Sequence, residues 1–327
     1  LPILPTLQLP PILRDFRHPR SLTLPLACLI ALCGLATVLP LLGSLHWILG
    51  LFENLPLQRG IALLGLLAIC LKTRRRRLAL LAGVFLLPNL YQLSYYYLPH
   101  FYRDTTPNLR VVTFNILRKN TEREKVLAYL QSTNADIIAV IEVNDEWVKA
   151  LDPLRKTHPH IAHFPNSHNF GIAFYSKYPV LGFTRPMPTR GHPLLIAKLD
   201  YHGSLLTVVV AHPVPPMSAL GAEFHNTYLG TTAATVSKLP GPVLLMGDLN
   251  TTPWSPLFSN LVSTTGLRDS GKGRGFQSTW KRRNPLFTAP IDHVLHSREL
   301  QPVARHIGPS CGSDHSPLQV DFTFPPP

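Results

Sequence analysis

An uncharged apolar run near the start of the chain limits most strongly what this sequence can fold into. The stretch LTLPLACLIALCGLATVLPLL covers residues 22–42 without a charged side chain, and a helix of this length crosses the hydrocarbon core of a bilayer. Apolar segments follow at about 55–71, which is short for a span unless Arg59 reaches the membrane surface from one end, and at 78–97, which ends in the tyrosine cluster YQLSYYY. The sequence therefore predicts a membrane region of about three transmembrane helices within residues 1–103, with the lipid bilayer as a partner.

Basic residues indicate how these helices are oriented. Arg14, Arg17 and Arg20 precede the first span and KTRRRR fills residues 72–77, whereas residues 43–54 contain no Lys or Arg. Because short basic loops stay in the cytoplasm, three spans in a multi-pass protein of a cell membrane, such as the bacterial inner membrane, place the rest of the chain on the extracytoplasmic side. Two spans would place it inside. A cleaved signal peptide is the alternative for the first span, but its length, the lack of an Ala-x-Ala site and the later spans argue against it.

The composition changes near residues 100–107. From residue 104 onward polar and apolar residues mix as in an ordinary globular domain, so residues 104–327 are predicted to form a separate domain. The net charge of +13 divides into +8 over residues 1–103 (10 Lys+Arg, 2 Asp+Glu) and +5 over 104–327 (21 against 16). Most of the excess thus lies beside the apolar spans, where it indicates orientation rather than nucleic-acid binding. The four cysteines show no spacing that predicts a disulfide framework.

The second domain is predicted to contain more strands than helices. Strands are predicted at 109–117, 135–143, 171–176, 194–212 and 318–324. The fourth of these is a hairpin that turns near His202 and Gly203. A capping box of Thr121 and Glu124 predicts the start of one helix, and another is predicted at about 219–238. This pattern favours packed mixed sheets with outer helices over a doubly wound parallel sheet.

Polar side chains recur where the apolar runs end. In GPVLLMGDLN, Asp248 and Asn250 follow a buried strand, and strand alternation would point both to the same side. The other strand ends or adjoining loops offer Asn115, Glu142, His212, Asp292 with His293, and Asp314 with His315. A single Asp at a strand end commonly caps a turn. Their joint recurrence instead indicates one shared site.

These residue types suit the hydrolysis of a phosphodiester. The substrate is anionic and repels hydroxide, so the reaction needs a hard cation, a group that aligns water, and contacts for the phosphoryl oxygens. Carboxylate and amide oxygens without cysteine favour Mg²⁺ or Mn²⁺ over Zn²⁺.

With these residues in this order, the sequence resembles the endonuclease/exonuclease/phosphatase superfamily, the deoxyribonuclease I-like phosphoesterases. The elements TFNIL, IIAVIEV, GIAFYSKYPV, VVVAHPVPP, LLMGDLNTTP, STW, IDHVL and GSDHSPL occur in the order of that family over about residues 108–324. The chain is similar, more narrowly, to bacterial members with N-terminal membrane spans. The resemblance implies an α+β fold, a four-layer α/β/β/α sandwich over residues 104–327 with its active site at one rim.

The resemblance also implies roles for individual residues. Glu142 is the main metal ligand, supported by Asn115 and Asp314. In the acid–base machinery, Asp248 orients and deprotonates the attacking water, and Asn250 holds the phosphate or the water. His315 contacts the phosphoryl oxygens and is oriented by Asp292, while His212 acts as a general acid or a phosphate contact.

The substrate is less constrained than the chemistry. Nucleic acid is favoured by the resemblance, and a phospholipid or sphingomyelin-like head group is the alternative because the chain is tethered to a membrane. A catalytically inactive membrane receptor or scaffold is a third possibility, but such a protein would have lost some of the residues named above. No protein partner is predicted.

Three local motifs permit other interpretations. GPSCG at 308–312 has the G-x-S-x-G spacing of a serine-hydrolase elbow, but SDHSPL follows where such an elbow requires a helix. Residues 157–169 bring four histidines together, which predicts a solvated loop or a transition-metal site. The basic residues of the Gly-rich stretch 272–283 predict a flexible loop or an anion-attracting lip.

Overall fold

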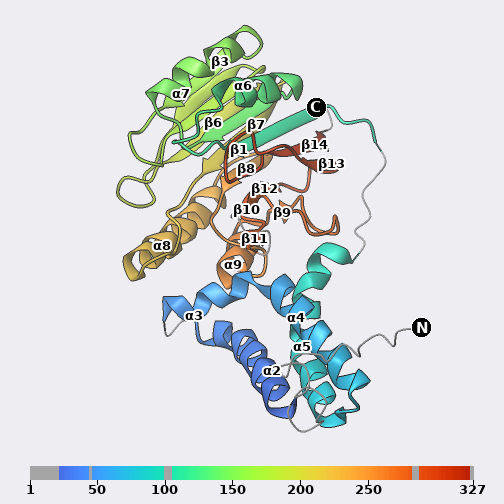
Figure 1. The fold of residues 1–327 in the computed structure, drawn as a ribbon. Helices are drawn as coiled ribbons and strands as arrows, with labels where there is room; N and C mark the ends of the chain where they lie inside the picture. The colour runs from blue at the N-terminus through green and yellow to red at the C-terminus, as the bar shows by residue number, and fades with distance from the viewer. Residues whose placement is uncertain (1–21, 44–45, 99–104, 282–286, 325–327) are drawn as a thin grey trace, which may run out of the picture. The chain divides into compact units, whose positions relative to one another are not determined.

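The computed structural model describes residues 22–43, 46–98, 105–281 and 287–324 (Figure 1). The chain divides into two compact units, residues 1–94 and 95–327. Some parts of the chain used in the sequence analysis lie outside the described residues. They are Arg14, Arg17 and Arg20, the last two residues of the basic stretch 272–283, and the predicted boundary between 103 and 104.

The first unit is helical. Its elements are α2 (Thr23–Val38), the 3₁₀ turn η2 (Leu39–Leu42), α3 (Trp47–Leu51), the 3₁₀ turn η3 (Phe52–Asn54), α4 (Pro56–Lys72) and α5 (Arg76–Tyr97), whose end belongs to the second unit. By length and composition, α2 with η2 forms one candidate span and α5 another. Helix α4 has 17 residues and becomes a third candidate only together with α3 and η3, from which it is bent by 69°. Two or three candidate spans therefore lie near the N-terminus, as predicted.

Arg59 lies inside the first unit rather than at its surface. Only 5% of the residue is exposed, and its Nε donates a hydrogen bond to Asn89 Oδ1 (2.8 Å). Its terminal amino groups donate to Ala36 O (3.1 Å), Gln92 Oε1 (3.2 Å) and Phe52 O. Arg59 is therefore not placed at the end of a span, which was the condition for residues 55–71 to be long enough by themselves. Buried donors need partners, and three other elements of the unit supply them.

The second unit contains two six-stranded sheets. The first has the order β13 (Gln301–Ile307), β14 (Leu318–Thr323), β1 (Leu109–Asn115), β2 (Ile137–Ile141), β4 (Ile172–Ser176), β3 (His160–Phe164). The second has the order β5 (Val180–Thr184), β6 (Leu194–Tyr201), β7 (Ser204–Ala211), β8 (Val243–Asp248), β12 (Asp292–His296), β9 (Arg268–Asp269). A separate ribbon pairs β10 (Trp280–Lys281) with β11 (Thr288–Ala289). The helices are α6 (Arg123–Ser132), α7 (Asp145–Ala150), α8 (Ala219–Val236) and α9 (Pro256–Thr265), with the 3₁₀ turn η4 (Asp152–Lys156).

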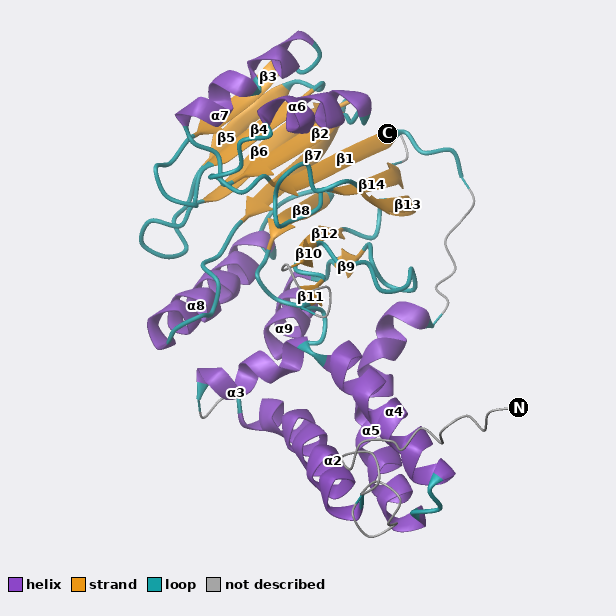
Figure 2. Cartoon of the chain, in the orientation of Figure 1, coloured by secondary structure: helices purple, strands orange, loops and turns teal. Residues whose placement is uncertain are grey.

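Alternation along the strands produces four layers. In β2, Ile137 and Ile141 belong to the core between the sheets, whereas Ile138 and Val140 belong to the core beneath α6 and α7, because successive side chains of a strand face opposite sides. A third core, which includes Leu245, lies between the other sheet and helices α8 and α9. Figure 2 shows these helices on the outer faces. Each fully buried aliphatic side chain stabilises the fold by about 1.5–3 kcal/mol, and the predicted four-layer sandwich is confirmed.

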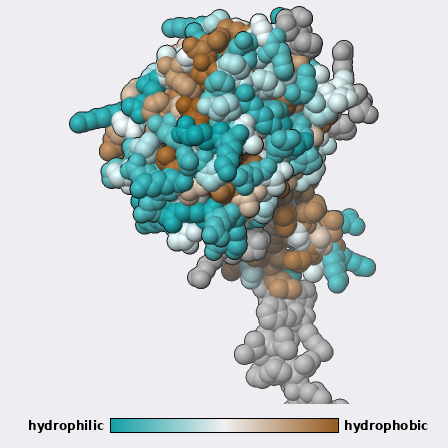
Figure 3. Space-filling model, turned by 90° about the horizontal axis from the view of Figure 1, so that it is seen from above, coloured by the Kyte–Doolittle hydropathy of each residue, from teal (hydrophilic) through white to brown (hydrophobic). Residues whose placement is uncertain are grey.

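The solvent-facing surface and the turns of the second unit agree with its mixture of polar and apolar residues. Hydrophilic residues predominate on the face that Figure 3 presents. The predicted hairpin of β6 and β7 is present, and His202 and Gly203 both have positive φ (53° and 86°), as a two-residue hairpin turn requires. The predicted capping box is wrong: α6 begins at Arg123, and Asn120 Oδ1 instead accepts the N–H of Glu122 at 2.9 Å.

The strand directions bring several strand ends to one edge. β1 is parallel to β2, and β7 is parallel to β8, so the carboxyl ends of each pair lie side by side. β12 runs antiparallel to β8 and places Asp292 directly opposite Asp248. Close approach of β7 and β8 requires glycine at position 247, where φ is +138° and a Cβ would lie 2.1 Å from Ala211 O.

Candidate active site

Polar side chains from both sheets converge where the parallel strands end. Asn115 is the last residue of β1 and Glu142 directly follows β2, while His212 directly follows β7 and Asp248 is the last residue of β8. Asp292, the first residue of β12, adds a carboxylate. All five residues are buried. Residues from separate strands and both sheets thus share one small volume.

The Asp248 carboxylate lies at the centre of this group. Its Oδ2 accepts a hydrogen bond from Asn115 Nδ2 (3.1 Å) and lies 3.6 Å from both His212 Nε2 and His315 Nε2. Its Oδ1 accepts the N–H of Asn250 at 2.9 Å. Burial raises the pKa of Asp248 to about 6, although the charge of His315 opposes this shift. A carboxyl group with such a pKa is suited to accept a proton near neutral pH.

His315 is paired with Asp292. Its Nδ1 lies 2.8 Å from Asp292 Oδ2, and Thr279 Oγ1 accepts the N–H of Asp292 at 3.0 Å. Burial alone would lower the pKa of His315, but the charges of Asp292 and Asp248 and the hydrogen bond raise it to about 10. Burial would likewise raise the pKa of Asp292, and His315 keeps it below its ordinary value. The imidazolium is therefore a fixed cation beside Asp248, suited to an anionic oxygen.

His212 and Asn250 are the two remaining residues of the predicted acid–base set, and they approach Asp248 in different ways. Burial lowers the pKa of His212, so its ring is neutral near pH 7. The side chain of Asn250 donates to Pro213 O (3.0 Å), and its φ is +48°. Strand alternation therefore does not orient Asn250, because β8 ends at Asp248. Asn250 reaches Asp248 through its backbone N–H.

Two acidic side chains mark a candidate cation position next to Asp248. Glu142 Oε1 accepts a hydrogen bond from Asn115 Nδ2 at 3.0 Å. Burial raises the pKa of Glu142, and the charge of the exposed Asp314 acts in the same direction. A divalent cation would offset this repulsion, and the oxygens of Glu142, Asp314 and the Asn115 carboxamide are hard donors that fit Mg²⁺ or Mn²⁺. Glu142 also has φ +64°, a strained backbone that is common at functional sites.

A second group of three side chains is packed closely enough to be considered as a metal site. Among the described residues, Asp248, Asp292 and His315 form the one acidic and histidine group whose possible ligand atoms all lie within 4.8 Å of one another. Within this trio the side chains face one another: His315 Nδ1 lies 2.8 Å from Asp292 Oδ2, and His315 Nε2 lies 3.6 Å from Asp248 Oδ2. Glu142, Asn115 and Asp314 stay the predicted ligand set.

The other sequence motifs take no part in this centre. His293 Nε2 bonds Thr251 O (2.9 Å) inside the core beneath α9. No helix follows Ser310, so GPSCG forms no serine-hydrolase elbow. In the described part of the chain the four histidines of 157–169 form no metal-binding group, and His158 Nε2 bonds Ala135 O at 2.9 Å.

Sequence reasoning missed three residues that position the centre. Ser313 Oγ donates to Asn115 O (2.8 Å) and accepts the N–H of His315 (3.0 Å). Trp280 Nε1 donates to Asp314 Oδ2 (3.2 Å), and Thr279 holds Asp292 as described above. Ser313 adjoins Asp314 in the motif SDH and Thr279 and Trp280 belong to STW, so motif position was the available signal.

The family follows from this arrangement together with a sequence match. Residues 112–315 match the profile of the Endonuclease/Exonuclease/phosphatase family, and this range contains every predicted site residue. The chain belongs to this family. It is therefore a phosphoric ester hydrolase, and enzymes of the endonuclease/exonuclease/phosphatase family depend on divalent metal ions. No match was found among curated proteins.

Solved structures share the fold of this family member at low identity. The Danio rerio TDP2 structure with a single strand DNA product has a TM-score of 0.57 and 16% identity, covering 66% of this chain and 98% of that chain. The endonuclease/exonuclease/phosphatase from Bacteroides vulgatus has a TM-score of 0.56 and 17% identity, covering 68% and 100%. The one from Beutenbergia cavernae has a TM-score of 0.54 and 19% identity, covering 67% and 72%.

Replacing Asp292 by asparagine is expected to lower the pKa of His315 well below about 10, because Asp292 supplies both the largest opposing charge and the hydrogen bond that raise it against burial. In the metal-free wild type, His315 contributes stability that is complete below its ordinary pKa of 6.5 and is lost as the pH rises towards 10. Both the rise in the pKa and this loss of stability should become smaller in Asp292→Asn, where Asp248 remains beside the ring. NMR titration of labelled histidine in chelator-treated protein measures it, and an unchanged His315 pKa would refute the pairing.

Proposed function

We propose that this protein is a Mg²⁺- or Mn²⁺-dependent phosphodiesterase that cleaves nucleic acid. The observation that carries the proposal is the Asp248 carboxylate, buried between His212, His315 and Asn115 at the rim of the two sheets. The shared fold with a TDP2 structure that holds a single strand DNA product supports a nucleic-acid substrate.

Three residues would hold the cation. Glu142, Asp314 and the Asn115 carboxamide oxygen would bind it, and when bound it supplies positive charge that offsets the charge of the phosphodiester. Asn115 also donates to both Glu142 and Asp248 (3.0 and 3.1 Å), so it links the cation position to the base. Trp280 holds Asp314 through the indole N–H.

Asp248 accepts the proton of the attacking water. The pKa of about 6 leaves it ionised at neutral pH while keeping it basic enough to take a proton. Water attacks phosphorus, the proton moves to Asp248, and the bond from phosphorus to the leaving oxygen breaks. Asn250 holds Asp248 Oδ1 through its N–H, which leaves Oδ2 to face the reacting groups.

The two histidines stabilise the anion in different ways. The His315 imidazolium contacts a non-bridging phosphoryl oxygen, and Asp292 keeps it charged and oriented. The neutral His212 lies on the other side of Asp248 Oδ2. As a neutral imidazole it can donate a hydrogen bond to the phosphate or to the leaving oxygen, and it would act as a general acid only after taking up a proton.

A phospholipid head group is the second candidate substrate. The candidate spans within the same chain favour it, because they would hold the enzyme at a lipid surface. A non-catalytic receptor is disfavoured, because every site residue implied by the family resemblance is present.

A paired assay tests the substrate. The purified chain is given single-stranded oligonucleotides and plasmid DNA in one arm and phosphatidylcholine or sphingomyelin vesicles in the other, each with Mg²⁺ and with a chelator. We expect Mg²⁺-dependent cleavage of nucleic acid and no release of lipid head groups. Cleavage of vesicles alone would overturn the nucleic-acid proposal in favour of the lipid one, and activity on neither would overturn both.

We also propose that the catalytic domain is extracytoplasmic. The basic residues 72–77 and the absence of Lys and Arg from residues 43–54 support this orientation, provided that three segments cross the bilayer. A reporter fused after Pro327 that is active only in the cytoplasm would refute it.

A further inference from the structure

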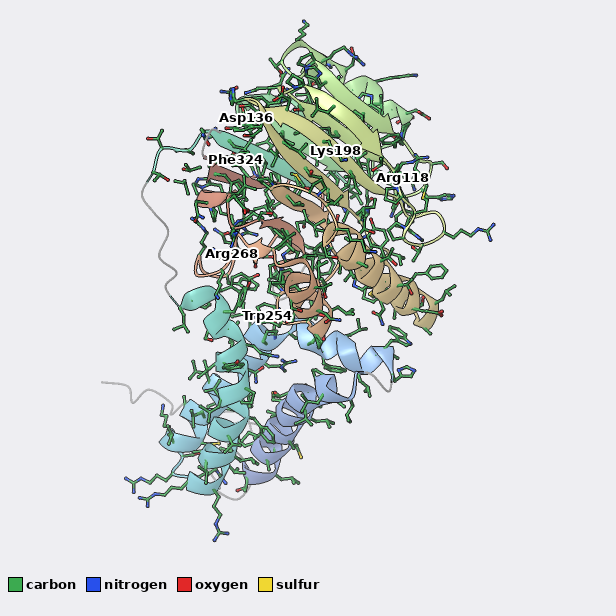
Figure 4. The ribbon with its side chains drawn as sticks, turned by 180° about the vertical axis from the view of Figure 1, so that it is seen from behind. Arg118, Asp136, Lys198, Trp254, Arg268 and Phe324 are labelled. Carbon is green, nitrogen blue, oxygen red and sulfur yellow. The ribbon has the colours of Figure 1, made fainter. Side chains whose placement is uncertain are left out.

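Near the candidate cation position, the guanidinium group of Arg118 donates a hydrogen bond to a neutral side chain. Arg118 lies three residues after Asn115, at the surface of the second unit (Figure 4). Among the residues that the structure describes, it forms no ion pair. The side chain of Arg118 has no role in the proposed mechanism. We propose that Arg118 binds the phosphate next to the scissile one, so that the enzyme prefers polynucleotides; this inference rests on the proposed function.

The backbone of Arg118 is fixed to the active site. Its N–H donates to Glu142 Oε2 at 3.2 Å, and its carbonyl oxygen accepts from Nε1 of the fully buried Trp147 at 3.3 Å. Leu117, just before it, has φ +57°. The turn therefore holds the root of the Arg118 side chain directly beside the predicted metal ligand.

The side chain is oriented by a neutral partner. Arg118 Nε donates to Asn169 Oδ1 at 3.2 Å, while its two terminal amino groups have no hydrogen-bond partner in the described part of the chain. Because an amide carries no charge, it orients the guanidinium without neutralising it. The two terminal amino groups of the guanidinium can therefore donate their N–H groups to a ligand. Their planar arrangement matches the oxygens of a phosphate.

The loop that carries Asn169 is itself anchored. Asn166 N donates to Val143 O (3.0 Å), and Val143 N donates to Gly171 O (3.2 Å). Gly171 is required there, since a Cβ would lie 1.8 Å from Val143 O. Phe170 contacts the ring of His212 (centroids 5.7 Å apart). One loop thus contacts both Arg118, through Asn169, and His212, through Phe170.

The chemistry favours a substrate with more than one phosphate. His315 already lies beside the proposed base, with Nε2 3.6 Å from Asp248 Oδ2, and serves the scissile group, so a guanidinium farther along the site suits the neighbouring phosphate of a chain. A choline head group would place a positive charge on the lipid, which Arg118 would repel. Single-stranded nucleic acid carries a phosphate on each nucleotide and meets this requirement.

The test compares substrates with one and with several phosphates. Full-length wild type, Arg118→Gln, Arg118→Lys and Asn169→Ala are assayed on bis(p-nitrophenyl) phosphate, on a dinucleoside monophosphate and on a trinucleotide. For Arg118→Gln we expect kcat/KM to fall about 10- to 100-fold on the trinucleotide, as for loss of a charged hydrogen bond, and to stay near wild type on the two substrates with one phosphate. Arg118→Lys should retain part of the activity, and Asn169→Ala should lose about three- to tenfold.

Salt dependence and a charge control complete the experiment. The plot of log kcat/KM on the trinucleotide against log salt concentration should become shallower by about 0.7 in Arg118→Gln. Lys198→Gln removes the same charge from an exposed position on β6 (Figure 4) and should leave the trinucleotide preference unchanged. Equal losses on all three substrates, or none, would overturn the inference while leaving the proposed function standing. Absence of nucleotide cleavage by the wild type would refute both.

Discussion

Asp248→Asn is expected to lower kcat by about 10²- to 10⁴-fold, the contribution of a positioned general base. Asparagine keeps the size of the side chain and an oxygen for the Asn250 N–H, but it cannot take a proton from water. The KM should change little, because the predicted metal ligands and His315 remain. Steady-state kinetics on the substrate identified by the paired assay, at saturating Mg²⁺, measures the effect.

A matched control separates chemistry from burial. Asp321 is also buried (4% exposed) and pairs with Arg110 at 2.8 Å, outside the active site. Asp321→Asn should lower the melting temperature and leave kcat near the wild-type value. If Asp248→Asn kept near-normal kcat, another group would have to take the proton from water.

Glu142→Gln is expected to weaken Mn²⁺ binding by more than about 100-fold, since even outer-shell changes at metal sites cost 10- to 100-fold. The amide loses the negative charge that Glu142 brings to the cation position, and activity should fall in parallel at low Mg²⁺. Raising the Mg²⁺ concentration should restore part of it. Mn²⁺ binding by calorimetry and activity as a function of Mg²⁺ concentration measure the two effects.

Glu122→Gln provides the control for this substitution. Glu122 pairs with Lys125 at 2.7 Å near the start of α6, and its change should leave Mn²⁺ affinity intact. Unchanged affinity in Glu142→Gln itself would place the cation elsewhere. The trio of Asp248, Asp292 and His315 would then be the next candidate.

Local patterns in the sequence predicted the elements of the fold well. An uncharged run of 20 or so residues needs no tertiary contact to be recognised as a candidate span, and the turn at His202 and Gly203 is encoded by the residues that tolerate positive φ. Local rules failed where a neighbour from elsewhere intervened. Asn120 replaced the capping box by accepting the Glu122 N–H while also donating to Cys311 O.

The candidate site likewise combines features that local sequence predicts with features that depend on distant residues. Its residues could be named from the sequence because each follows an apolar run, but their partners could not. Asp292 faces Asp248 only because β12 and β8 pair in that register, and Asn115 joins Glu142 to Asp248 only because the two sheets meet at that edge. The alternation argument for Asn250 failed because it assumed that the strand continued past Asp248.

The sequence by itself determined the apolar segments, the strand order along the chain and the set of oxygen and nitrogen donors available for catalysis, since these depend on periodicity and residue type. Only the tertiary structure decided that Arg59 is buried, that His315 lies beside two carboxylates and that the guanidinium of Arg118 bonds an amide. Burial, charge separation and hydrogen-bond geometry depend on distances between residues far apart in the chain, and these distances exist only after the strands have paired and the sheets have packed.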